Sequence, residues 1–74
     1  MKDKVISIIA KVLEVPTSEI ELDMGIGDIP SWDSFHHITI ISELEDEFDT
    51  TFDVKDLMKI ENVADIISLV EKQQ

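Results

Sequence analysis

Ser34, His36 and His37 lie within four residues of one another and are the first candidates for chemistry. A serine with a nearby histidine could supply the nucleophile and general base of a hydrolase. If a helix begins at Ser34, however, residues two apart point about 200° apart, so His36 cannot reach the Ser34 hydroxyl. His37 lies on the stripe expected to face the core, and a chain of 74 residues has little room for an oriented triad above a cleft. We therefore expect no enzyme activity.

A dedicated metal site is also not expected. The segment "DMGIGD" at 23–28 has an acid at each end but lacks the alternating ligands and the terminal glutamate of a calcium loop. The chain has no cysteine, which excludes thiolate sites and disulfides. Clustered carboxylates could hold divalent ions only loosely; these are Glu43, Glu45, Asp46, Glu47 and Asp49.

Asp33 and Ser34 are two consecutive candidates for the N-cap of the helix that follows them. Taken alone, such a pair indicates nothing more than a helix start. If Asp33 is the cap, Ser34 becomes the first helical residue and its hydroxyl is exposed. A phosphate ester on that oxygen would lie at the positive end of the helix, where an anion is favoured.

Four stretches have the apolar spacing or the capping residues of a helix. The first has a stripe at i, i+3, i+4, i+7 and i+8, with Asp3 as the expected cap and Pro16 as the end. The second runs from about Ser34 to Phe48. Asp53 and Asp56 have N-cap and N3 spacing ahead of a short third helix at Leu57 and Met58, and Asn62 caps a fourth. The inward residues expected are Val5, Ile8, Ile9, Val12 and Leu13; His37, Ile40, Ile41, Leu44 and Phe48; and Val63, Ile66, Ile67 and Val70.

A long connection at 15–33 joins the first two helices. Because structureless loops of this length are uncommon, we expect a turn or two of helix within it. The apolar side chains expected to pin it to the core are Ile20, Leu22, Met24, Ile26 and Ile29. The apolar segment at 50–54 is too short and isolated to pair as a strand. The sequence thus predicts one all-α domain over 1–74, a small bundle of three main helices plus one short helix.

The acidic residues are concentrated in one part of the chain. The net charge is −11, and all twelve acids between 12 and 54 lie in a window without a lysine or arginine. Such a field attracts basic partners and repels nucleic acid and anionic membranes, although it could also be a solvated face that only maintains solubility. No apolar run approaches the ~20 residues of a membrane span. We expect a soluble, cytoplasmic monomer.

The outward face of the second helix carries Phe35, Thr39, Ser42 and Asp46, with Ile38 at its border. Phe35 is either covered by Trp32 and the 15–33 connection or exposed. If exposed, Phe35 and Ile38 form an apolar spot with a polar rim, as in a partner-docking surface. The acids expected to complete this surface are Glu43, Glu45, Asp46 and Glu47.

Nearly the whole chain resembles an acyl carrier protein. The resemblance is carried by "VISIIAKVLEVPTSEIELD", "WDSFHHITIISELEDEFDTTFDV" and "LMKIENVADIISLV", which are similar to the first helix and loop, the Asp-Ser-Leu motif with its helix, and the last two helices. It implies that Ser34 accepts 4′-phosphopantetheine from coenzyme A, added by a separate magnesium-dependent transferase. It also implies that Asp33 positions the helix start and the modifying enzyme. The thiol of the arm would then carry an acyl or aminoacyl group as a thioester between a loading enzyme and downstream transferases with basic docking patches.

Three residues depart from the pattern of this family. Phe35 replaces the leucine of the motif, and His36 and Thr39 stand where carriers of fatty-acid synthesis usually have acids. These departures indicate partner enzymes of a specialised biosynthetic pathway. A D-alanyl carrier protein for wall-polymer modification is the alternative within this class. An acidic helical adaptor that never takes a prosthetic group is the alternative from another class.

Overall fold

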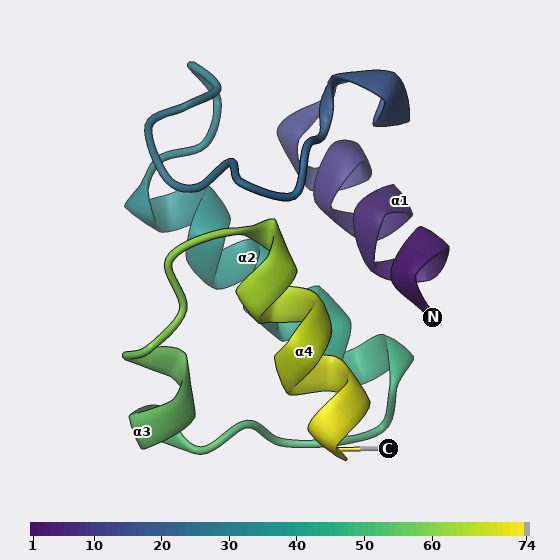
Figure 1. Cartoon of the computed structure of the whole chain (residues 1–74), viewed down its shortest axis with the longest axis vertical. Coiled ribbons are helices and arrows are strands. Elements are labelled where there is room, and N and C mark those ends of the chain that lie inside the picture. Colours follow the sequence, from purple (N-terminus) through teal and green to yellow (C-terminus); the bar gives the residue numbers. More distant parts are fainter. Residues whose placement is uncertain (74) are drawn as a thin grey trace.

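The computed structural model describes residues 1–73, and in that range it is helical and contains no strand (Figure 1). The all-α prediction, with three main helices and one short one, is confirmed. The elements in chain order are α1 (Lys2–Leu13), the 3-10 helix η1 (Thr17–Glu19), α2 (Ser34–Glu47), α3 (Val54–Leu57) and α4 (Val63–Gln73). None of the helices in residues 1–73 is both long and apolar enough to cross a membrane.

Helix α1 begins at Lys2, two residues earlier than an Asp3 cap would place it. Met1 is the N-cap and makes no side-chain cap bond, so the prediction that Asp3 caps this helix is wrong. Asp3 instead lies in the first turn, where its charge faces the positive end of the helix. Helix α1 ends ahead of Pro16, as expected, because Glu14 takes a left-handed conformation with φ 59° and the Val15 amide donates to the carbonyl of Ala10.

The core lies between α1, α2 and α4, which pack around one another, while α3 stands at the edge (Figure 1). The inward stripe of α4 is confirmed, and Leu69 is a buried addition to it. On α2 the expected stripe is buried at its centre and half-buried at His37 and Phe48. The buried residues are Val5, Ile9, Ala10, Leu13, Ile20, Ile29, Trp32, Ile40, Ile41, Leu44, Phe52, Val63, Ile66, Ile67, Leu69 and Val70.

The connection at 15–33 contains η1, as predicted, but fewer of its apolar side chains reach the core than expected. Ile20 and Ile29 are buried, and Met24 is half-buried against the core. Leu22 and Ile26 are 44% and 52% exposed, so the prediction that these two side chains pin the connection is wrong.

Backbone hydrogen bonds hold this part of the connection instead. The carbonyls of Leu22 and Met24 accept from the amides of Ala64 and Val63, at 2.9 and 2.8 Å. These are first-turn amides of α4, which have no partner within their own helix. Gly25 permits the close approach, because a Cβ at this position would lie 2.2 Å from the Glu61 carbonyl oxygen. The connection is thus attached to the start of α4 by its backbone, so the side chains of Leu22 and Ile26 can face solvent.

The predicted caps of the last two helices are confirmed. The Asp53 carboxylate accepts from the Lys55 amide at 2.9 Å, and α3 follows directly. The Asn62 side chain accepts from the Asp65 amide at 2.9 Å at the start of α4. Each cap satisfies an N–H group that the first turn of a helix leaves unpaired.

Candidate functional site

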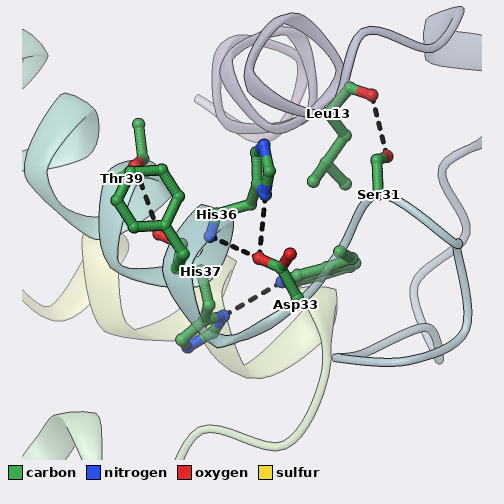
Figure 2. A network of polar contacts seen from close by, with 8 residues as sticks. Leu13, Ser31, Asp33, His36, His37 and Thr39 are labelled. Atoms are coloured by element: carbon green, nitrogen blue, oxygen red, sulfur yellow. Dashed lines mark hydrogen bonds and ion pairs between the residues drawn. The ribbon is translucent and has the colours of Figure 1, made fainter.

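Asp33 is the N-cap of α2. Its backbone is extended, and Oδ1 accepts hydrogen bonds from the His36 amide and from His36 Nδ1, both at 2.8 Å (Figure 2). The hydrogen bond from the His36 backbone amide has the larger effect on Asp33, and the one from the His36 ring adds to it. Together they lower the pKa of the Asp33 carboxyl below its ordinary value of 3.8. The start of α2 therefore carries a carboxylate that stays ionised at neutral pH.

Ser34 is the first residue of α2 and is exposed. Because Asp33 makes the cap bond, that bond does not use the Ser34 hydroxyl. The hydroxyl therefore lies at the surface beside the N-terminal amides of a helix of 14 residues, where the helix dipole favours an anion. A phosphodiester on this oxygen would fit the site without displacing a buried group.

Among residues 1–73, the two histidine rings make their hydrogen bonds with Asp33 and Trp32 and none with Ser34. The His36 ring contacts the Asp33 carboxylate, and His37 Nδ1 lies 3.1 Å from the indole nitrogen of Trp32. A general base for Ser34 would have to lie within hydrogen-bond reach of its hydroxyl. The arrangement does not resemble a nucleophile with its base.

The pairing of Trp32 with His37 was not predicted from the sequence. Trp32 is 1% exposed, its ring stacks against the imidazole at a centroid distance of 6.0 Å, and its indole N–H donates to Nδ1. Burial lowers the pKa of His37 below its ordinary value of 6.5. The signal that could have found this pair is the lone tryptophan just before the helix, combined with a histidine on the inward stripe.

The loop that leads into Ser34 is also tied to α1. The Ser31 hydroxyl donates to the carbonyl of Leu13 at 2.8 Å (Figure 2), and the Gly27 amide donates to the carbonyl of Trp32 at 2.9 Å. These bonds, together with the buried Trp32 ring, fix where the chain enters α2. Ser34 is therefore presented from a constrained position rather than from a loose loop.

Two cavities lie beside α2, and His37 lines both. The first, of about 270 Å³, lies between α2 and α3 and is lined by His37, Ile38, Ile41, Ser42, Glu45 and Leu57. The second, of about 260 Å³, lies under the connection and the loop before α4, and is lined by Gly25, Ile26, Trp32, His37, Ile60, Glu61 and Asn62.

Phe35 is exposed, which decides between the two alternatives left open by the sequence. Its side chain is 72% exposed, and that of Ile38 is 68% exposed. With this exposure, Phe35 is covered neither by Trp32 nor by the 15–33 connection. Among the aromatic contacts of residues 1–73, the Phe35 ring makes one, a T-shaped contact with the His36 ring at a centroid distance of 5.6 Å.

The four acids of the expected docking surface differ in their surroundings. Glu43 and Asp46 are exposed. Glu47 is exposed and pairs with Lys4 at 2.8 Å. Glu45 is half-buried, and its carboxylate accepts from the Phe52 amide at 2.9 Å, so it holds the chain that leaves α2.

No group of three or more histidine, cysteine or acidic side chains that could hold a metal ion occurs in residues 1–73. The loop acids Glu21, Asp23 and Asp28 do line a shallow hollow with Met24. One Asp28 carboxylate oxygen already accepts a hydrogen bond from the Gly25 amide at 2.8 Å.

Comparison with known proteins identifies the family. Residues 3–70 match the family model described as a phosphopantetheine attachment site. The chain is 36% identical over 70 residues to the acyl carrier protein of Thermotoga maritima, covering 95% of this chain and 86% of that protein. It is 32% identical over 65 residues to the acyl carrier protein of Exiguobacterium sibiricum, covering 88% and 82% of the two chains.

A solved structure agrees with these matches. The holo acyl carrier protein of Geobacter metallireducens superimposes with a TM-score of 0.87 at 29% identity, covering 97% of this chain and 83% of that one. Proteins of this kind are carriers of 4′-phosphopantetheine rather than enzymes, in agreement with the expectation from the sequence. The chain belongs to the acyl carrier protein family.

Proposed function

We propose that Ser34 is the residue that bears 4′-phosphopantetheine. The observation that supports this most is the division of roles at the start of α2, where Asp33 makes the cap bond and Ser34 is exposed beside it. The group supplies a thiol on which an acyl or aminoacyl cargo is held as a thioester. Asp33 holds the first turn of α2 in place, so the Ser34 oxygen has a fixed position when a phosphopantetheinyl transferase approaches.

The attachment can be tested by intact-mass spectrometry after exposure to coenzyme A, magnesium and a broad-specificity transferase. Wild-type protein should gain one phosphopantetheine, and Ser34→Ala should gain none. Ser42→Ala is the matched control, because Ser42 is an exposed serine on the same helix and its variant should still be modified. Absence of a mass gain in wild type, under conditions that modify another carrier, would favour the acidic adaptor.

We further propose that the exposed face of α2 receives the partner enzymes. Phe35 and Ile38 supply exposed apolar area next to Ser34, and Glu43 and Asp46 supply exposed negative charge farther along the helix. A basic patch on the partner would complement this charge. Glu47 and Glu45 would contribute less than the sequence suggested, since the first pairs with Lys4 and the second binds the Phe52 amide.

The identity of the cargo depends on which enzymes load the arm. Phe35, His36 and Thr39 replace the residues usual in fatty-acid carriers, so we propose a specialised pathway, with D-alanyl transfer to wall polymers as the alternative. Competition between candidate acyl- and aminoacyl-loading enzymes on the holo protein tests this choice. The cytoplasmic location, the monomeric state and the single domain over 1–74 remain predictions.

A further inference from the structure

The two carboxylate oxygens of Asp33, the residue before the proposed attachment serine, have different surroundings. Oδ1 accepts from the His36 amide and contacts Nδ1 of the His36 ring, both at 2.8 Å. Oδ2 makes no side-chain hydrogen bond or ion pair among residues 1–73 (Figure 2). The Asp33 side chain is 60% exposed, which leaves this second oxygen accessible to a group that approaches from solvent.

The Asp33 carboxylate also decides which nitrogen of His36 carries a proton. Asp33 is ionised at neutral pH and can only accept, so Nδ1 of His36 must be the donor. This holds for the neutral ring, whose single hydrogen is then on Nδ1, and for the protonated ring, which has a hydrogen on each nitrogen. Trp32 imposes the opposite arrangement on His37, whose Nδ1 accepts. Of the two neighbouring histidines, His36 is therefore the one that acts on Asp33.

The His36 ring is itself held by its neighbours. It lies in the first turn of α2, three positions after the cap residue whose carboxylate it contacts. The Phe35 ring meets it in a T-shaped contact, with the ring planes at 90°. Residues two apart on a helix point about 200° apart, so His36 is directed away from Ser34. Within this chain, its effect on the attachment site is transmitted by Asp33.

The second hydrogen bond to Oδ1 restrains the orientation of the Asp33 carboxylate. The last torsion of an aspartate side chain is soft, so a carboxylate held by one amide alone can rotate and exchange its two oxygens. The bond from the His36 ring opposes this rotation and keeps Oδ2 on the outer side. Among residues 1–73, the ion pair of Asp33 is the one with His36, so no lysine competes for Oδ2. A basic group of another protein can thus bind Oδ2 without displacing either bond.

We infer that His36 is a positioning residue for the modification of this chain, because its Nδ1–H fixes the Asp33 carboxylate so that Oδ2 can bind a basic side chain of the phosphopantetheinyl transferase. In the reaction itself, the Ser34 oxygen bonds to the coenzyme A phosphorus that bears the pantetheine. The bond from that phosphorus to the bridging oxygen breaks, adenosine bisphosphate leaves, and the serine proton passes to a base of the transferase. The inference rests on the proposed attachment at Ser34 and adds a residue that acts through Asp33.

The kinetics of modification by a broad-specificity transferase, with coenzyme A and magnesium in excess, test this role. His36→Asn keeps an N–H donor at the place of Nδ1, and His36→Leu has nearly the same shape as asparagine but no donor. The asparagine variant should be modified like wild type. The leucine variant should raise KM for the carrier about two- to tenfold and leave kcat nearly unchanged, as expected for the loss of one hydrogen bond.

A second background tests whether the effect passes through the carboxylate. Glycine is tolerated as an N-cap at little cost, so Asp33→Gly should fold while lacking the carboxylate. In the Asp33→Gly protein, His36→Leu should have no further effect on KM. An equal effect in both backgrounds would show that His36 contacts the transferase directly and would overturn the inference.

Nitrogen NMR of the His36 ring gives a readout that needs neither the transferase nor a stable variant. In wild type at neutral pH, Nδ1 should carry a hydrogen, and a neutral ring protonated on Nε2 alone would overturn the inference. Modification at Ser34 with an unchanged or lower KM for His36→Leu would also overturn it while leaving the attachment intact. Wild type that takes no phosphopantetheine, or Ser34→Ala that still takes it, would instead overturn the proposed attachment, and with it this role.

Discussion

Helix α4 buries five of its side chains in the core, whereas α3 buries none of its four residues. The start of α4 is held by the Asn62 cap and by two carbonyls of the 15–33 connection. Helix α3 is held by the Asp53 cap, by the half-buried Leu57 and by a 3.5 Å pair between Asp56 and Lys72 at the surface. Exposed ion pairs contribute little, so the local stability of α3 should be far below that of α4.

This difference has a functional meaning. Helices α1, α2 and α4 form the stable frame that presents Ser34, and α3 forms one wall of the cavity next to it. A wall that is weakly attached can shift without loss of the core. Substitutions in and around each helix can measure this difference in stability.

Truncating a buried side chain of α4 to alanine should destabilise the protein far more than truncating a side chain next to α3. Ile66 is 1% exposed, so Ile66→Ala should lower the free energy of unfolding by about 2–5 kcal/mol, enough to unfold much of a domain this small. Met58, which follows α3, is 81% exposed, and Met58→Ala should change the free energy of unfolding by less than about 0.5 kcal/mol. Urea titration followed by circular dichroism measures both, and losses of similar size would remove the distinction between the two helices.

The backbone contact between the 15–33 connection and α4 can be weakened by a substitution at one position. A Cβ at Gly25 would meet the Glu61 carbonyl oxygen, so Gly25→Ala should force the backbones apart and cost about 1–3 kcal/mol of unfolding free energy. Ile26→Ala is the control, because Ile26 is next to Gly25 in the chain and its side chain is 52% exposed. If thermal melts show the same midpoint for the two variants, the close approach does not stabilise α4.

The contact between the connection and α2 should weaken in acid. The pKa of His37 is lower in the folded protein than its ordinary value of 6.5, so the folded state binds fewer protons than the unfolded one. The contribution of the neutral ring is therefore complete above pH 6.5 and is lost as the pH falls through and below that value. Protonation would also place a second hydrogen against the Trp32 N–H.

Thermal midpoints between pH 7.5 and 5.5 measure this effect, which should be smaller than that of Gly25→Ala. Wild type should lose stability over this range, and His37→Gln should lose less. Glu45 and Glu61 each line one of the two cavities together with His37, and both are present in the variant. Parallel curves for the two proteins would show that His37 is not the group responsible.

Changes on the outward face of α2 should leave folding almost unaltered and act on partners. Glu43→Lys should slow modification by the transferase most at low salt, because exposed charges act mainly on association. Phe35→Ala should slow it at every salt concentration, because a desolvated anchor acts mainly on dissociation. Glu71→Lys, an exposed charge reversal on α4, is the control and should behave as wild type.

Equal salt dependence of Glu43→Lys and Phe35→Ala would contradict this division between charge and apolar area. Unfolding of the Phe35→Ala protein would contradict its assignment to the surface.

The contrast between α4 and α3 also shows what the sequence could predict. Caps such as Asp33, Asp53 and Asn62 act within a few residues, and the inward stripe of α4 follows from helical period alone, so these were found. Asp3 was assigned as a cap because it precedes an apolar stripe, but the helix starts one residue before it.

Features that depend on how the connection folds could not be found in this way. Leu22 and Ile26 have apolar side chains, yet backbone bonds to α4 hold their segment and turn these side chains outward. The pair of Trp32 and His37, and the bond from the Phe52 amide to Glu45, join residues whose closeness depends on the loops around α2. For the same reason the sequence alone does not determine whether the loop covers Phe35, which is 72% exposed in the structure.

Tandem mass spectrometry of the modified wild-type protein can show whether the prosthetic group is attached to Ser34, as we propose. Five other serines, at 7, 18, 31, 42 and 68, serve as internal controls within the same molecule. Fragments that contain Ser34 should carry the phosphopantetheine mass, and fragments that contain only the other serines should not. A phosphopantetheine found on any other residue, with Ser34 unmodified, would show that Ser34 is not the attachment site.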